Sequence, residues 1–332
     1  MKNFLYISIL SIFLLSGCSQ KIKISALKPA QIDEISQYKK IAVSSFSNDK
    51  VAFSDKLESK LAHIKAEDKF FFTVIGRKDI DEILEEQKLQ LSGLIDKSSA
   101  VKIGELLGAQ AIIGGNISNA SLKDTLYYTE RKKCLDKKCK KYKTYNVRCT
   151  KRTISLSAEI KILSVEDGSI IYGDTLSKSD YWNHCSDRSN ALPSKEDGLN
   201  SMANSLTSIF VKKLAPYYTQ YYVEILDTPE IDYTDKQEQL LENALVYLEH
   251  KRYKKAEQLL SKLLDSTSDS CYVAAYNLGL IKEKNGELKK ANQLYALADS
   301  LTIEPNEALD KAIIRVKSSI HSRSEATRQI KQ

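Results

Sequence analysis

Four cysteines in the middle of the chain, Cys134, Cys139, Cys149 and Cys185, have the residue type and spacing to do chemistry. In an oxidising compartment such cysteines form disulfides by default, and four cysteines allow three pairings. A zinc site is the alternative, because His184 adjoins the last of them. Their spacings, however, match no common zinc pattern. We therefore predict disulfides of open pairing and no metal site.

Cys18 stands in a different context, directly after two small residues that follow an apolar run at 4–15. A positive N-terminus and an apolar run too short to span a membrane have the layout of a secretory signal. Small residues before a cysteine are typical of bacterial lipoproteins, which are cleaved and acylated there. We predict a signal peptide over residues 1–17 and a lipid anchor on Cys18. Since Ser19 is not the Asp that retains lipoproteins at the inner membrane of enteric bacteria, the anchor is expected in the outer membrane, facing the periplasm.

Positive charge is concentrated in residues 120–152, where tyrosines are interleaved with basic residues. From Lys123 to Arg152 the net charge is +9, whereas the whole chain carries +7. The lysines of this predicted basic patch are Lys132, Lys133, Lys137, Lys138, Lys140, Lys141 and Lys143. The segment is either a disulfide-pinned hairpin with a solvated tip or a cationic surface for anionic lipid, glycan or an acidic protein. Nucleic acid would suit the chemistry, but the predicted compartment argues against it.

No motif of catalysis or cofactor binding occurs in the sequence. It lacks Gly-x-Ser-x-Gly, His-Glu-x-x-His, a Walker loop and a dinucleotide fingerprint. An acidic cluster between Asp79 and Glu86 resembles paired catalytic carboxylates, but its helical spacing beside Lys78 and Lys88 indicates a solvated face. We predict no enzyme, no catalytic residue and no cofactor.

The order of predicted elements indicates an α/β (α+β) domain over residues 39–225, with a mixed sheet and flanking helices. Short β-branched runs predict strands, and amphipathic spacing predicts helices. In chain order these are a strand at 39–46, a helix at 51–63, a strand at 70–75, helices at 79–91 and 98–108, strands at 111–117, 154–162 and 169–175, and a helix at 205–218. Residues 18–38 show no clear period and predict an acylated polar tether.

The core of this domain resembles the CsgG family of bacterial envelope lipoproteins. The matching features are Val74-Ile75 with Arg77 after it, the phrase from Ile83 to Gly93, Ala100-Val101-Lys102-Ile103-Gly104, and Leu107-Gly108-Ala109-Gln110-Ala111. The resemblance implies a core fold shared with the related LpoB lipoproteins. It also implies a possible homo-oligomer, because CsgG itself oligomerises to export curli subunits.

Residues 235–330 predict an all-helical domain of two helix–turn–helix repeats, at 236–267 and 272–305, and a capping helix at 306–322. The second repeat closely resembles the tetratricopeptide pattern, and Ala256 and Ala291 are separated by 35 residues, against a period of about 34. Small residues let paired helices approach closely, so the predicted packing residues are Ala256, Leu278, Gly279, Ala291 and Ala298. The last ten residues are expected to fray.

Together these patterns predict a non-enzymatic, outer-membrane-anchored lipoprotein that acts as a protein-binding scaffold in assembly or export of cell-surface structures. Stacked repeats present a concave surface, so envelope proteins are expected to bind there. An LpoB-like regulator of a peptidoglycan synthase is one alternative, and a CsgG-type secretion pore is another. The pore is less favoured, because membrane-crossing strands need about 9–11 residues with an apolar lipid-facing set, whereas residues 120–152 are crowded with lysine.

Overall fold

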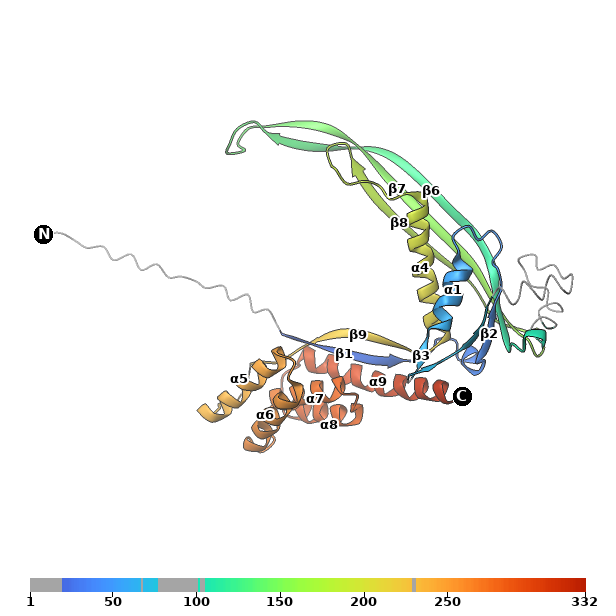
Figure 1. Cartoon of the computed structure of the whole chain (residues 1–332). Coiled ribbons are helices and arrows are strands. Elements are labelled where there is room, and N and C mark those ends of the chain that lie inside the picture. The colour runs from blue at the N-terminus through green and yellow to red at the C-terminus, as the bar shows by residue number, and fades with distance from the viewer. Residues whose placement is uncertain (1–19, 67, 77–100, 102–104, 229–230) are drawn as a thin grey trace. The chain divides into compact units, whose positions relative to one another are not determined.

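The computed structural model divides the chain into two compact units (Figure 1). It describes residues 20–66, 68–76, 101, 105–228 and 231–332. Unit 1 comprises Tyr218–Ser324 with the described end of Met1–Leu27, and unit 2 comprises Lys28–Tyr217 with Glu325–Gln332. Cys18, the predicted helix at 79–91 and most of the predicted helix at 98–108 lie outside the described residues. Among the residues described, no helix is both long enough and apolar enough to cross a membrane.

A five-stranded mixed sheet forms the centre of unit 2 (Figure 1). Its strands are β2 (Lys40–Val43), β5 (Thr73–Ile75), β6 (Ala111–Cys134), β7 (Tyr142–Ser164) and β8 (Ile170–Cys185). In the order β5-β2-β6-β7-β8, β2 is parallel to both its neighbours, whereas β6, β7 and β8 are antiparallel. The mixed α/β fold predicted from the sequence is therefore confirmed. A short helix, η1 (Glu34–Gln37), precedes the sheet, and β3 (Lys65–Ala66) pairs with β4 (Lys69–Phe70).

Two helices, α1 (Phe53–Ala62) and α4 (Lys195–Leu214), pack against one face of this sheet (Figure 1). They pack on the apolar side of β7. The alternating apolar residues of the predicted strand at 154–162 are buried there, as expected. Helix α4 begins well before the predicted start at residue 205, because the Ser194 hydroxyl accepts a 3.0 Å hydrogen bond from the Asp197 N–H and caps it. The close approach of Gly198 to Ile154 then allows α4 to lie against β7.

The strands β6 and β7 form one long hairpin, which extends beyond the part of the sheet that α1 and α4 cover (Figure 1). The strands are 24 and 23 residues long, and pairing continues from Ala111↔Ser164 to Cys134↔Tyr142. From residue 123 outward, most side chains of β6 are exposed on both faces. The hairpin predicted over 120–152 is thus the outer half of two continuous strands that begin in the core.

Unit 1 contains helices α5 (Asp235–Glu249), α6 (Tyr253–Ser266), α7 (Tyr272–Lys284), α8 (Leu288–Ser300) and most of α9 (Glu307–Lys331). The helix pairs α5–α6 and α7–α8 correspond to the two predicted repeats. A two-stranded sheet of β1 (Lys21–Lys28) and β9 (Tyr217–Glu224) packs on these helices through Ile22, Ile24 and Val223.

The prediction of a polar tether over residues 18–38 is corrected by β1. Ile22, Ile24 and Ala26 alternate with polar residues and are buried, so this short segment has the period of a strand with one dry face. Its burial requires a partner strand almost 200 residues away, and the helix predicted over 205–218 includes the first two residues of that partner. Pro216 ends that helix, and β9 follows it.

The last residues of the chain form the end of α9 and do not fray. Within unit 2, the Gln329 amide is buried and binds the backbone of Ala30, with its Oε1 2.7 Å from the Ala30 nitrogen and its Nε2 3.2 Å from the Ala30 oxygen. Its Nε2 also donates to Asp33 at 3.0 Å. These hydrogen bonds fix the segment that the sequence pattern alone indicated as loose.

Replacing Gln329 with Ala is expected to destabilise unit 2 by about 1–3 kcal/mol, because the buried backbone groups of Ala30 would lose their partner. Urea unfolding followed by the fluorescence of Trp182, the single Trp of the chain, reports on unit 2. The exposed neighbour Lys331, changed to Ala, is the matched control and should leave the midpoint unchanged. Equal effects of the two changes would contradict a specific role for Gln329.

Candidate functional site

The four cysteines of the hairpin region are paired in the structure. Cys134 is joined to Cys139 at the end of the β6–β7 hairpin, and Cys149 is joined to Cys185. The second pair follows from the sheet register, since Cys149 on β7 lies directly opposite Cys185 on β8. Val147 packs with this disulfide in a small apolar cluster. The structure thus selects one of the three pairings that the sequence left open.

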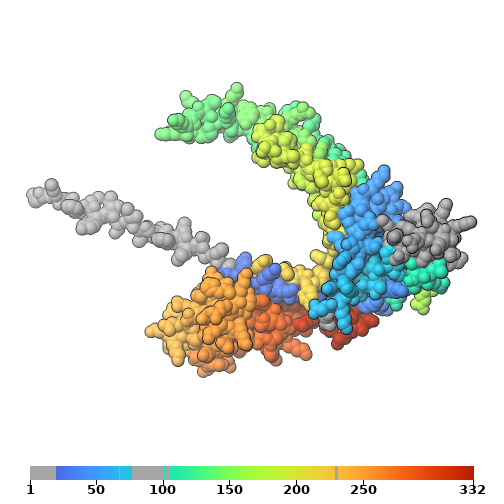
Figure 2. Space-filling model, viewed as in Figure 1, coloured from blue at the N-terminus to red at the C-terminus, as the bar shows by residue number. Residues whose placement is uncertain are grey.

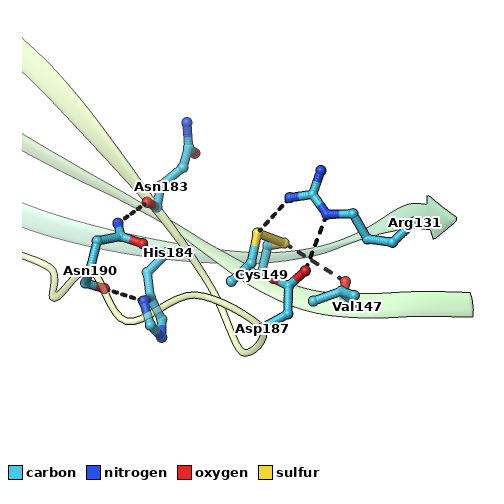
Figure 3. Close-up of a disulfide and its surroundings, with 8 residues drawn as sticks. Arg131, Val147, Cys149, Asn183, His184, Asp187 and Asn190 are labelled. Atoms are coloured by element: carbon cyan, nitrogen blue, oxygen red, sulfur yellow. Dashed lines mark hydrogen bonds and ion pairs between the residues drawn. A yellow bond between two sulfur atoms is a disulfide. The ribbon is translucent and has the colours of Figure 1, made fainter. Parts of the chain in front are cut away.

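His184 lies near these cysteines but points elsewhere (Figure 3). Successive side chains of a strand face opposite sides, so His184 and Cys185 lie on opposite faces of β8. The His184 Nδ1 contacts the Asn190 carbonyl oxygen, and the Asn190 amide donates to the Asn183 oxygen at 3.0 Å. In the described part of the chain, no three His, Cys, Asp or Glu side chains gather where they could hold a metal ion.

Arg131 covers the Cys149–Cys185 disulfide from β6 (Figure 3). Its Nη2 lies 4.0 Å from the Cys185 sulfur, and its Nε donates to Asp187 at 3.3 Å. Arg152 is also paired, because its Nε and Nη2 bind the two carboxylate oxygens of Asp124 at 2.8 and 2.6 Å. These two arginines of the basic segment are therefore engaged in holding the hairpin.

The lysines of the predicted basic patch have a different environment. All seven (Lys132, Lys133, Lys137, Lys138, Lys140, Lys141 and Lys143) are exposed at the end of the hairpin. Figure 2 shows this end of the hairpin, in green, with its atoms open to solvent. The structure therefore brings the patch residues together on one continuous tip.

In unit 1 the structure buries all five predicted packing residues, Ala256, Leu278, Gly279, Ala291 and Ala298. Gly279 is the position with least space, because a Cβ there would lie 2.5–2.7 Å from ring carbons of Tyr295. The absence of a side chain at Gly279 therefore lets α7 and α8 approach closely enough for the Tyr276 and Tyr295 rings to pack, with centroids 5.7 Å apart.

Helix α7 is covered by the chain itself. Every residue from Tyr272 to Ile281 is buried, which leaves no open face for a partner. The Asn277 amide accepts from the Leu226 N–H at 3.1 Å and donates to the Leu226 oxygen at 2.6 Å. The Tyr276 hydroxyl donates to the oxygen of Glu224 at 3.1 Å. An extended segment at the end of β9 and after it thus covers α7. A partner of unit 1 must therefore bind a surface other than that of α7.

A buried ion pair connects four elements of unit 1. The fully buried carboxylate of Glu283 on α7 accepts two hydrogen bonds from the Arg315 guanidinium of α9, both at 2.8 Å. Tyr221 of β9 and Tyr295 of α8 donate their hydroxyls to the same carboxylate at 2.9 and 2.6 Å. Although burial lowers the pKa of Arg315, its hydrogen bonds to Glu283 and the charge of that carboxylate raise the pKa above the usual value. Glu283 therefore has its charge and its oxygens satisfied inside the protein.

This network was not predicted from the sequence. The one local indication of the buried ion pair is that α7 is apolar on all sides, which is typical of a buried helix. A Glu near the end of such a helix is unusual and needs a partner. Arg315 stands 32 residues further along the chain, so nothing local connects the two.

Alkaline pH is expected to destabilise unit 1 through the buried Tyr276. Burial raises the pKa of Tyr276 to about 12. The neutral form stabilises the fold fully below about pH 10, the value of an unfolded Tyr, and this contribution is lost as the pH rises through about 12. The loss corresponds to about 2–3 kcal/mol. Urea unfolding at a series of pH values, followed by far-UV circular dichroism, measures it.

The matched control for this effect is Tyr276→Phe, which cannot ionise. The variant should start slightly less stable, because the hydrogen bond to Glu224 is gone, but should lose less stability between about pH 10 and about pH 12. If the free energy of unfolding falls equally with pH in the two proteins, ionisation of Tyr276 does not contribute to the loss of stability.

A cavity of about 780 Å³ lies in unit 1 beside β9 and the start of α9. Tyr221, Tyr276 and Arg315 line its inner side, whereas Tyr222 and Lys311 line its outer part. Tyr222 is 67% exposed. One side of the cavity is therefore lined by residues of the buried network around Glu283, and the other side by exposed aromatic and charged side chains.

Comparison with known proteins gives one match at the level of sequence. The model of the family described as "Curli production assembly/transport component CsgG" matches residues 8–123. The resemblance predicted from the sequence is confirmed, and the matched part contains β1, β2, α1, β5 and the first half of β6. No curated protein matches the chain.

Three solved structures are similar to parts of the chain. The PelC dodecamer from Paraburkholderia phytofirmans is 12% identical, with a TM-score of 0.29, and covers 59% of this chain and 98% of its own. The C-terminal domain of LpoB from Salmonella enterica is 12% identical, with a TM-score of 0.26, and covers 45% and 95%. Lipoprotein GNA1162 from Neisseria meningitidis is 15% identical, with a TM-score of 0.26, and covers 52% and 96%.

Proposed function

We propose that this protein is a non-enzymatic scaffold of the Gram-negative envelope. Acyl chains on Cys18 hold it to the outer membrane on the periplasmic side, and it recruits envelope proteins during assembly or export of cell-surface structures. Two features support the proposal: the lipoprotein pattern that ends at Cys18 and the match to a family described as an assembly and transport component. The role requires neither a cofactor nor a nucleic acid.

The observation that carries the recruiting role is the cavity beside β9. Helix α7, which would line the concave surface of a repeat domain, is covered by the segment around Leu226. The cavity instead offers exposed Tyr222 above a fixed inner wall. Tyrosine is enriched among the residues that dominate binding energy in protein interfaces, because it brings a large, stiff contact area. We therefore place the partner surface at this cavity and not on the repeat groove.

Capture of envelope proteins on the immobilised chain tests this role. Tyr222→Ala is expected to weaken capture at least about 10-fold, the effect of a lost interface anchor. Tyr181→Ala is the matched control, because Tyr181 is similarly exposed at 61% but lies on β8, in the other unit. Capture that responds equally to both changes would count against the cavity. Capture of a peptidoglycan synthase would favour the LpoB-like regulator over an assembly scaffold.

The anchor is tested separately by Cys18→Ala. The unchanged protein should incorporate labelled palmitate and stay with outer membranes through a wash in about 1 M salt, whereas the variant should take up no label and be released by that wash. Retention of the unlabelled variant on the membrane after the salt wash would remove the anchor from the proposal.

Self-association is a further part of the proposed role. Among the described strands, β8 pairs with β7 alone, so its other edge presents backbone groups over residues 170–185. Such an edge can pair with another chain. Native mass spectrometry of the detergent-released protein should show a defined oligomer, and a monomer at all concentrations would favour the regulatory alternative.

A further inference from the structure

The end of the β6–β7 hairpin, residues 132–143, is a preformed and strongly cationic tip. It contains seven lysines and one acidic residue, Asp136. The Asp136 carboxylate is used within the turn, where it accepts from the N–H groups of Lys140 and Lys141 at 2.8 and 3.3 Å. The Cys134–Cys139 disulfide closes the same turn. The positive charge is thus held on a rigid loop, and little of the binding energy is needed to order it.

Exposed apolar side chains accompany this charge. Leu135 at the turn is 64% exposed, and Tyr142 is 53% exposed. Tyr128, which lies on β6 before the tip, is 70% exposed. The ammonium of Lys132 lies 4.6 Å from the centre of the Tyr142 ring. Tyrosine and lysine together are typical of the boundary between lipid and water, where an aromatic ring lies among headgroups and a lysine stem extends beside it.

The residue types distinguish a membrane surface from other anionic partners. Lysine is a hydrated point charge that suits a diffuse layer of phosphates, whereas arginine suits specific bidentate recognition. The basic residues of the tip are all lysines, and Arg131, which directly precedes it, is held in an ion pair with Asp187. A soluble polyanion would also attract the lysines but would leave Leu135 in water. A lipid surface satisfies both features.

We propose that residues 132–143 dock on an anionic phospholipid surface. The lysines contact headgroup phosphates, and Leu135 and Tyr142 enter the headgroup region. This contact is independent of acylation at Cys18 and goes beyond the recruiting role proposed above.

Vesicle sedimentation of the unacylated chain that begins at Gln20 tests this contact without the lipid anchor. The chain should sediment with vesicles of phosphatidylglycerol and phosphatidylethanolamine, and not with vesicles of phosphatidylcholine alone. Changing Lys137, Lys138, Lys140 and Lys141 to Gln should weaken binding by at least about 100-fold, because each surface lysine contributes about a factor of five. Changing the exposed Lys236, Lys254, Lys255 and Lys262 to Gln removes the same charge from unit 1 and should change binding little.

Two further readouts separate insertion from simple charge attraction. The fluorescence of a Leu135→Trp variant should shift to the blue on anionic vesicles, whereas that of Trp182 in the unchanged protein should not. Equal weakening by the two sets of four lysine changes, or an unshifted emission of the new Trp, would overturn the proposal. Binding to dextran sulfate but not to anionic vesicles would also overturn it, in favour of a soluble polyanion.

Discussion

Replacing Arg315 with Met should lower the free energy of unfolding of unit 1 by about 3–5 kcal/mol. The change removes the countercharge of Glu283, whose side chain is fully buried. Two tyrosine hydroxyls would remain on the carboxylate, but they cannot replace a positive charge in a medium of low polarity. Urea unfolding followed by far-UV circular dichroism measures the loss.

Two controls make the Arg315 result specific. Arg328→Met removes an exposed ion pair with Asp33 and Glu325 and should cost at most about 1 kcal/mol. The double change Glu283→Gln with Arg315→Met removes both charges, so it should recover part of the loss. If the single and double variants of this pair are equally unstable, the cost comes from lost packing and not from an unpaired charge.

Replacing Cys149 and Cys185 with Ala together should lower the stability of unit 2 by about 4 kcal/mol in the chain-entropy view of disulfides. The bond closes a loop with a sequence separation of 36 residues, so its loss frees a large part of the unfolded chain. It also removes the sulfurs from a cluster with Val147. Because Trp182 lies on β8 three residues before Cys185, its fluorescence follows the unfolding.

The second disulfide provides a control within the same hairpin. Cys134 and Cys139 are five residues apart, so replacing both with Ala should cost about 2 kcal/mol, roughly half as much. Reduction of the unchanged protein breaks both bonds and should lower its stability by about the sum of the two losses, roughly 6 kcal/mol. If the two double variants are equally stable, the sheet register and not the bond holds β8 against β7.

The elements that could be predicted from the sequence are those with a strong local period. The strict alternation from Ile154 to Ile162 predicted its strand and its buried face, and the helix pairs of unit 1 followed from small residues at repeat spacing. The lysines of the tip could be predicted to lie together, because a hairpin brings its two ends into one place.

The features that could not be predicted depend on partners distant in sequence. The pairing of Cys149 with Cys185 requires the register of β7 on β8, which the alternation of either strand alone does not set. The concave surface expected for the repeats is closed, because Asn277 binds the backbone of Leu226 from a segment outside the repeats. The apolar residues of β1 alternate with polar ones, as in a strand. The segment is a strand, however, because β9 pairs with it and the helices of unit 1 bury its apolar face.

With the acyl chains proposed for Cys18, the early start of β1 would limit how far unit 1 can stand from a bilayer. Ser19 and Gln20 are the residues between Cys18 and the first residue of the strand, Lys21. The three backbone steps from Cys18 to Lys21 span at most about 11 Å. A fatty-acylated Cys18 would therefore keep the helical-repeat unit against the leaflet, so its partners would be met by lateral diffusion along the membrane and not by reaching across the periplasmic space.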